Sequence, residues 1–482
     1  EEERCGEKCV DVDADEANCG ACVTSCSDGE TCVDGSCGCA SGLTDCSGAC
    51  VDLLSDDTHC GNCGTSCEGL ESCSEGVCFF DAGDDCSDAA RGVSITRVSL
   101  YQVVEAQLHA AGATVPVEQR AVDIIQGKDA VVRVHVDLTE SSAREVSARV
   151  FLKNGSDSPE VFFDKKEVSA DTLQSDWASS LNVRIPAAKI QADTEYFVEL
   201  VRCDESATGA EGLTRIPASG STPLDARRTG SIRVAFLPVV FNEIVPDTSD
   251  AKLAQYTAEV MKRYGTTDVI TQVLPQIVLP PSEEPGADMN AMLDLVYNQR
   301  VTDEPPDDVY YYGLVGASVN WAGLAVISTQ PADRAAVGLT DNFFAFAHEL
   351  AHNHGLRHAP CGDPDAVDVG YPYANGVTSV WGFDSRLSEL QGPELYDFMS
   401  YCGPTWVSDY NYNLLSDQIA AVNTSALSRR HGSPETWETL RVGPHGARWV
   451  ASRPMNDFPA DHRVAAVVSD APPHDRRGFL LR

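Results

Sequence analysis

The sequence predicts a multidomain protein whose fold class changes twice along the chain. A disulfide-rich N-terminal region is followed by an all-β sandwich and then by an α/β (α+β) domain. Sixteen of the nineteen cysteines lie before residue 87, short apolar-polar alternations follow to about residue 203, and helical and strand patterns then alternate. A chain of 482 residues also exceeds what one hydrophobic core usually serves. We expect boundaries at 1–90, 91–230, 231–430 and 431–482.

The first region, residues 1–90, contains two cysteine-rich repeats with a period of 41 residues. Seven cysteines recur at this displacement: Cys5, Cys9, Cys19, Cys22, Cys26, Cys32 and Cys37 return as Cys46, Cys50, Cys60, Cys63, Cys67, Cys73 and Cys78. Cysteines this dense usually form disulfides outside the cell, so we expect two small disulfide frameworks, with zinc binding by the CxxC pairs as the alternative. The repeats resemble short cysteine-rich modules found in tandem on secreted bacterial proteins, which implies spacing or attachment.

The charge of the chain restricts the classes of partner that we expect it to bind. The net charge is −38, and the first ninety residues carry many acidic residues against only Arg4 and Lys8. Such a surface excludes nucleic acid as an expected partner. Ca²⁺ binding is possible but not assignable, because the acidic run 11–15 resembles the start of an EF-hand loop while its second copy, 52–56, lacks the middle ligand.

Residues 91–230 read as a β-sandwich and a connection. Six segments have the length and alternation of strands: Val93–Tyr101, Ala130–Leu138, Glu145–Leu152, Val161–Val168, Leu181–Ile185 and Glu195–Arg202. Residues 204–230, rich in Gly, Ser, Thr and Pro, connect them to the next domain. This domain serves either as a rigid spacer or as a binding surface for substrate or carbohydrate.

Residues 231–430 form the predicted α/β domain. The expected strands are Ile232–Leu237, Val309–Leu314 and Gly323–Ser328, and the expected helices are Asp250–Tyr264 and Met289–Asn298. The long uncharged stretch from Val309 to Thr329 is interrupted by Gly, Ser and Asn, so we interpret it as two strands and a turn and expect no membrane span. The segment Asp409–Tyr412 and the apolar run up to Val422 are expected to form the wall of the specificity pocket and a closing helix. Residues 431–482 read as a short β-rich appendage.

Four histidines within eleven residues are the most informative local feature. The run from His348 to His358 fits the pattern H-E-x-x-H-x-x-G-x-x-H, and the preceding segment from Asp341 contains no Gly or Pro, which favours a helix. On a helix, His348 and His352 lie on one face, where both can reach one Zn²⁺. Gly355 can end the helix in the left-handed region and return His358 as the third ligand.

The same spacing assigns a role to the glutamate. Glu349 lies beside the metal instead of on it, where it can take a proton from water as general base. Three protein ligands leave a fourth position for water, which is typical of catalytic zinc sites. His354 points away from the ligand face and is interpreted as a packing residue.

The motif resembles the signature of metzincin zinc peptidases, of secreted bacterial type, and the subfamily stays open. That resemblance implies a twisted mixed sheet, an active-site helix and a methionine turn, which it places at Met399. It also implies that Tyr401 ligates zinc at rest and stabilises the oxyanion during reaction. Asp397 departs from the serine of the astacin-like and serralysin-like families, and Ala359 also departs from the diagnostic residues.

Three cysteines lie beyond residue 90. Cys361 and Cys402 flank the third histidine and the methionine turn, so we expect them to be bonded. Cys203 either bonds Cys86 across the sandwich or places a thiolate on zinc as a switch. The odd total means that at least one cysteine is free or has its partner outside the chain.

Together these features predict a secreted or cell-surface zinc endopeptidase acting on extracellular proteins or glycoproteins. The cysteine content indicates an oxidising compartment, and the absence of a first methionine and a signal segment is expected for a processed form. The alternative is an adhesive or carbohydrate-binding surface protein in which peptidase activity is secondary. Cleavage specificity and oligomeric state have no indication in the sequence.

Overall fold

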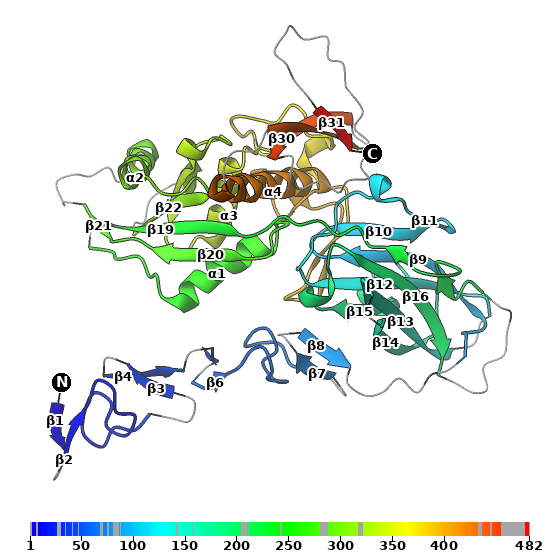
Figure 1. The fold of residues 1–482 in the computed structure, drawn as a ribbon, viewed down its shortest axis with the longest axis horizontal. Helices are drawn as coiled ribbons and strands as arrows, with labels where there is room; N and C mark the ends of the chain where they lie inside the picture. The colour runs from blue at the N-terminus through cyan, green and yellow to red at the C-terminus, as the bar shows by residue number, and fades with distance from the viewer. Residues whose placement is uncertain are drawn as a thin grey trace, which may run out of the picture.

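The computed structural model describes most of the chain. Its description leaves out residues 1, 6–7, 27–29, 34, 41, 47, 68–70, 75–76, 81–85, 87, 141–142, 157, 204–209, 211, 242, 280–287, 317–321, 432–435, 444–445, 455–477 and 482. The chain is multidomain, with a disulfide-rich N-terminus, antiparallel β-sheets and then a mixed α/β region (Figure 1). In the described residues no helix is long and apolar enough to cross a bilayer.

The N-terminal region is built from two-stranded hairpins. They comprise β1 (Glu2–Cys5), β2 (Lys8–Asp11), β3 (Glu30–Val33), β4 (Ser36–Cys39), β5 (Thr44–Asp45), β6 (Cys50–Val51), β7 (Glu71–Ser74) and β8 (Val77–Phe80). Disulfides repeat with the 41-residue displacement: Cys5–Cys22 and Cys19–Cys32 return as Cys46–Cys63 and Cys60–Cys73. The zinc alternative for the CxxC pairs is therefore wrong, because all four of their sulfurs are in disulfides.

One cysteine of this region stands apart. Cys9 is exposed and is the free cysteine of the part of the chain that the structure describes. Its counterpart Cys50 is bonded to Cys39, a residue just ahead of the second repeat.

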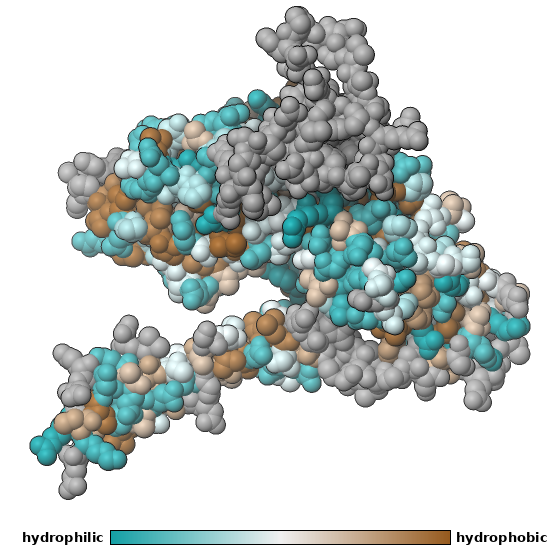
Figure 2. Space-filling view, in the orientation of Figure 1, coloured by the Kyte–Doolittle hydropathy of each residue, from teal (hydrophilic) through white to brown (hydrophobic). Residues whose placement is uncertain are grey.

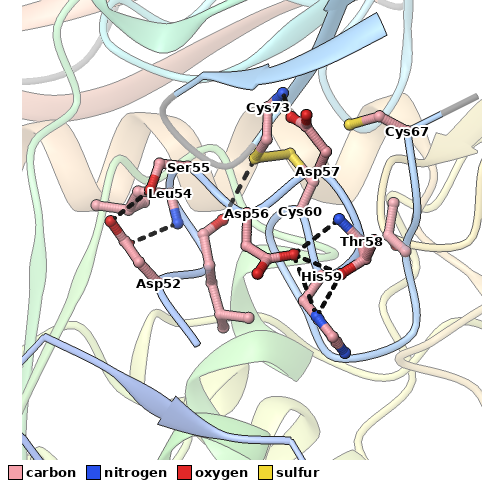
Figure 3. Close-up of a disulfide and its surroundings, with 12 residues drawn as sticks. Asp52, Leu54, Ser55, Asp56, Asp57, Thr58, His59, Cys60, Cys67 and Cys73 are labelled. Atoms are coloured by element: carbon pink, nitrogen blue, oxygen red, sulfur yellow. Dashed lines mark hydrogen bonds and ion pairs between the residues drawn. A yellow bond between two sulfur atoms is a disulfide. The ribbon is translucent and has the colours of Figure 1, made fainter. Parts of the chain in front are cut away.

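The acidic residues of the repeats organise turns. Around the Cys60–Cys73 disulfide, the Asp52 carboxylate accepts hydrogen bonds from the Leu54 N–H at 3.0 Å and the Ser55 hydroxyl at 2.7 Å (Figure 3). Asp56 accepts from the Thr58 N–H at 2.7 Å in the same way. Carboxylates that bond the backbone two residues on are typical of Asx turns.

The second region holds two antiparallel five-stranded sheets. The first has the order β11-β10-β9-β12-β15 and the second β14-β13-β16-β17, with β18 also pairing β16. Their strands are β9 (Val93–Tyr101), β10 (Glu105–Ala110), β11 (Ala113–Thr114), β12 (Ala130–Leu138), β13 (Arg144–Asn154), β14 (Glu160–Val168), β15 (Leu181–Ile185), β16 (Thr194–Arg202), β17 (Arg215–Ile216) and β18 (Thr222–Pro223). Alternate residues of both sheets enter one core, and Cys86 is bonded to Cys203.

The third region is a mixed sheet with helices on both faces. Its strand order is β20-β19-β22-β24-β23, with β21 beside β19, and only β23 runs antiparallel. The strands are β19 (Ile232–Val240), β20 (Val269–Val273), β21 (Ile277–Val278), β22 (Val309–Val315), β23 (Gly323–Ala325) and β24 (Ala335–Leu339). Helices α1 (Asp250–Met261) and α3 (Phe343–Asn353) pack on one face, and α2 (Met289–Asp303) packs on the other.

Two expectations about this sheet need correction. Strand β23 ends at Ala325 instead of Ser328, because the chain turns there and the Ser328 hydroxyl bonds Asp333 at 2.8 Å. Strand β24, between β22 and β23, was not expected from the sequence. Apolar side chains are exposed at the opposite edge, on β20 and β21 (Figure 2).

The β-sheets and the mixed sheet share one continuous core. The Trp406 indole N–H donates to the Val103 carbonyl at 3.1 Å, and Lys128 Nζ donates to the Met261 carbonyl at 2.9 Å. In the connection, Arg227 pairs with both Asp123 and Asp417 at 2.6 and 2.7 Å. The region with the histidines is therefore held firmly against the β-sheets.

The remaining elements follow the sheet. They are β25 (Gly382–Asp384), β26 (Glu389–Gln391), β27 (Tyr396–Asp397), β28 (Thr405–Trp406), helix α4 (Asp409–His431), and β29 (Thr436–Gly443), β30 (Gly446–Pro454) and β31 (Gly478–Leu481), the last three forming one sheet.

Candidate metal centre

Helix α3 carries the first two histidines. It begins at Phe343, and the Asn342 side chain caps it by accepting from the Ala345 N–H at 3.0 Å. Because the helix packs into the core, every residue from Ala345 to Asn353 is buried. Gly355 has φ +87°, the left-handed conformation that ends a helix at low cost to glycine. The chain therefore turns directly after the second histidine.

Three imidazoles converge at this turn. The potential ligand atoms of His348, His352 and His358 all lie within 4.8 Å of one another. The Nε2 atoms of His352 and His358 are 3.1 Å apart, and the three side chains are buried. His358 is held in a bridge to Val367, on the segment that follows the helix.

The other ring nitrogen of each histidine faces a backbone carbonyl. His348 Nδ1 donates to the Phe398 carbonyl at 2.9 Å, His352 Nδ1 donates to the Leu356 carbonyl at 2.8 Å, and His358 Nδ1 donates to the carbonyl of Asp365. A carbonyl only accepts, so each proton is on Nδ1 and each Nε2 lone pair is free for a metal.

Burial also favours the neutral form of these rings. Burial, with a smaller contribution from the neighbouring imidazoles, lowers the pKa of His348 to about 4 and that of His352 to about 3. Neutral imidazoles with convergent Nε2 atoms are the ligands that Zn²⁺ prefers. The cluster therefore fits a zinc site.

Glu349 lies next to the cluster on the side of the sheet. Its side chain is buried, and burial raises the pKa of its carboxyl to about 8. A Cβ atom at Gly323 in strand β23 would come within 2.7 Å of the Glu349 Cγ and 2.9 Å of its Oε1. The glutamate is thus packed against the edge strand, at a position where only glycine leaves it room.

A turn centred on Met399 is hydrogen-bonded to the segment that carries the histidines. The Phe398 carbonyl accepts from His348, and the Met399 carbonyl accepts from the Ala359 N–H at 3.0 Å. Met399 is fully buried. This turn therefore links the first histidine to the residue that follows the third.

Asp397 holds the turn against helix α4. Its carboxylate accepts four hydrogen bonds: from the Met399 N–H at 2.8 Å, the Ser408 N–H at 2.9 Å, the Ser408 hydroxyl at 2.6 Å and the Asn411 amide at 2.8 Å. A serine hydroxyl at 397 has a single oxygen and could not accept all four. The departure noted at this position therefore has a structural use.

Tyr401 lies at the open side of the cluster. Its ring centroid is 4.8 Å from that of His358, and its side chain is 59% exposed. The Tyr401 N–H donates to the Cys361 carbonyl at 3.0 Å, and Cys361 is bonded to Cys402. The disulfide thus joins the segment after the third histidine to the segment after the methionine turn.

Two other residues are placed away from the cluster. The His354 ring is buried, donates from Nδ1 to the Leu350 carbonyl at 2.7 Å and stacks on Tyr310. The thiolate-switch hypothesis for Cys203 is wrong, because its sulfur is bonded to Cys86.

Sequence reasoning missed the carbonyls of Phe398, Leu356 and Asp365, as well as Gly323. Backbone carbonyls carry no residue-type signal. The glycine could have been suspected, since it opens the expected edge strand, but its contact with Glu349 depends on the fold.

A comparison with protein-family models bears on this site. Residues 333–402 match the family model described as Peptidase M66, and residues 38–81 match that of the stigma-specific STIG1-like protein family. No curated protein matches the chain. A solved structure entitled "Structure of a chaperone-substrate complex" is similar at 18% identity and a TM-score of 0.25, over 50% of this chain and 40% of that one. Residues 333–402 therefore carry the match to Peptidase M66, a metzincin-type zinc peptidase family, and the buried triad of His348, His352 and His358 in this domain is consistent with a zinc metallopeptidase.

Proposed function

We propose that this chain is a secreted zinc-dependent endopeptidase that hydrolyses peptide bonds in extracellular proteins or glycoproteins, with Glu349 as general base. The observation that carries the proposal is the convergence of three Nε2 atoms beside a buried carboxylate. The disulfides of the chain support an extracellular location.

His348, His352 and His358 would hold the ion. Bound there, Zn²⁺ supplies Lewis-acid chemistry that acidifies water and polarises the scissile carbonyl. Glu349 accepts the proton of the attacking water and later passes it to the leaving amine nitrogen. Tyr401 donates a hydrogen bond to the developing oxyanion from the open side. Met399 packs as an apolar floor beneath the imidazoles.

The edge strand supports a peptide substrate. In the pairing of β23 with β24, the Ala322 carbonyl accepts from Leu339 N–H and the Val326 N–H donates to the Ala335 carbonyl. Antiparallel alternation then turns the N–H and C=O groups of Gly323 and Ala325 toward the open edge. An extended peptide can pair with such an edge, which favours endopeptidase over small-molecule hydrolase activity.

The finer fold assignments belong to the same proposal. We interpret the two antiparallel sheets as a β-sandwich and the mixed sheet with α3 and the methionine turn as a metzincin catalytic domain.

The test is cleavage of an unfolded protein by the full chain, with and without a zinc chelator, for the wild type and Glu349→Gln. We expect chelation to abolish cleavage, added zinc to restore it, and Glu349→Gln to lose roughly 100-fold to 10,000-fold in kcat. Glu394→Gln, on an exposed loop, is the matched control. Wild-type activity in Glu349→Gln would overturn the proposal, and binding without cleavage would favour the adhesive alternative.

A further inference from the structure

Two phenols on strand β22 face the same side of the sheet, under helix α3. Tyr310 and Tyr312 are each 1% exposed, and their hydroxyls have no hydrogen-bond partner among the residues that the structure describes. Leaving a buried hydroxyl without a partner costs about 1–3 kcal/mol, so each one calls for an explanation.

The Tyr312 hydroxyl lies against Gly338. A Cβ at Gly338 of strand β24 would overlap the Tyr312 hydroxyl oxygen. Gly338 is paired directly with Gly323, whose Cβ would meet Glu349. Hence the phenol and the carboxylate each occupy the space of a missing side chain, and the two spaces face each other across one strand pair.

The register brings these two groups close together. The hydrogen-bonded residues on either side of Gly323 and Gly338 make them a non-hydrogen-bonded pair, in which Cβ positions are about 4.5–5.5 Å apart on one face. The packing of helix α3 is consistent with this proximity. Tyr312 packs edge-on against Phe346, which lies three residues before Glu349 on the same helical face.

We propose that Tyr312 is a positioning residue for Glu349: its hydroxyl donates a hydrogen bond to one buried water, which in turn donates to the carboxylate and holds it toward the histidine cluster. This inference rests on the proposed role of Glu349 as general base. No hydrogen bond to the Glu349 carboxylate occurs within the described part of the chain, whereas the carboxylates of Asp397 and Asp417 each have partners. Tyr312 is a donor in need of an acceptor, and an ionised Glu349 carboxylate is an acceptor on the same face of the strand pair.

The phenol keeps its proton under working conditions. Burial raises the pKa of Tyr312 well above 10, and the charge of Glu349 raises it further. It therefore acts as a donor at neutral pH and takes no part in proton transfer.

The chain offers a matched control two residues away. Tyr310 is on the same strand and face, equally buried and equally without a partner, but it stacks on His354 at 4.6 Å. If both phenols only fill the core, Tyr310→Phe and Tyr312→Phe should behave alike.

The experiment compares zinc-loaded full-length wild type, Tyr312→Phe, Tyr310→Phe and Glu349→Gln. We expect Tyr312→Phe to lose about tenfold in kcat, with KM, zinc affinity and melting temperature unchanged, and Tyr310→Phe to match the wild type in kcat. Equal kcat in the two phenylalanine variants would overturn the inference. Full activity in Glu349→Gln would instead overturn the proposed function.

A crystal structure of the zinc-loaded wild type gives a second, independent readout. One water spans at most about 5.5 Å between two hydrogen-bonding atoms. The Tyr312 oxygen and the nearest Glu349 oxygen are expected within that distance, with a water between them. A larger separation would overturn the inference whatever the kinetics.

Discussion

The carboxylate of Asp397 accepts from both the backbone N–H and the hydroxyl of Ser408, at 2.9 and 2.6 Å, and so fastens the methionine turn to the start of helix α4. Because the Phe398 carbonyl of that turn accepts from His348 Nδ1, these hydrogen bonds extend from Ser408 to a histidine of the candidate metal centre. Helix α4 therefore takes part in positioning His348 through the methionine turn.

Replacing Asp397 should weaken both fold and zinc site. Asp397→Asn keeps the shape of the side chain, but its amide NH₂ would face groups that now donate to the carboxylate, so at least one of these donors loses its acceptor. We therefore expect a loss of about 2–3 kcal/mol in the free energy of unfolding. Urea denaturation measures the loss, and chelator competition should show weaker zinc binding. The exposed Asp363→Asn, on the loop after the third histidine, is the control. Equal stability of the two variants would contradict the role given to Asp397.

The sequence was most informative where local pattern decides structure. Strands β9, β12 and β15 have the expected bounds because alternation and flanking turns define them locally. The three histidines were found because four-residue and six-residue spacings fix geometry on a helix and its turn. Strand β24, with the sequence Ala-Ala-Val-Gly-Leu, has few β-branched residues and is a strand because β22 and β23 pair with it.

The rest of the site depends on contacts between distant segments. Gly323 meets Glu349 across 26 positions, and His348 meets the Phe398 carbonyl across 50. Asp397 was noticed only as a departure from related families. Its use became clear once Ser408 and Asn411 were seen to donate to it. No pattern within a short window encodes these relationships.

A methyl group at position 323 should impair catalysis more than stability. The Cβ of Gly323→Ala would lie 2.7 Å from the Glu349 Cγ, so the glutamate must shift from its present position. We expect kcat to fall by about 10-fold to 100-fold, since displacing a catalytic group by about 1 Å has effects of that size. Steady-state kinetics on an unfolded protein substrate measures the change. Gly38→Ala, where a Cβ meets nothing within 4 Å, should leave kcat unaltered.

Acid should destabilise the β-sheets through His135. Burial lowers the pKa of this histidine to about 3, so the unfolded chain binds a proton below about pH 6.5 while the folded chain does not. Stability from this group is complete above pH 6.5 and is lost as the pH falls toward 3.

The measurement compares urea unfolding of the wild type and His135→Gln at pH 7.5 and pH 5. The wild type should lose on the order of 1–2 kcal/mol more than the variant over this interval. The metal-ligand histidines titrate in both proteins and cancel in the difference. Parallel losses in the two proteins would show that His135 is not the group responsible.

The Cys361–Cys402 disulfide should stabilise the metal centre as well as the fold. It closes a loop with a sequence separation of 41, for which chain entropy gives a stabilisation of about 2–4 kcal/mol. The loop begins just after His358 and ends just after the methionine turn, so loosening it frees both sides of the cluster. We expect the double variant Cys361→Ala, Cys402→Ala to unfold at lower urea concentration and to bind zinc more weakly. The Cys86–Cys203 disulfide closes a loop in the β-sheets with a sequence separation of 117. The control double variant Cys86→Ala, Cys203→Ala should therefore lose stability without losing zinc affinity. If both double variants bind zinc equally well, the Cys361–Cys402 disulfide stabilises the fold but has no separate effect on the metal centre.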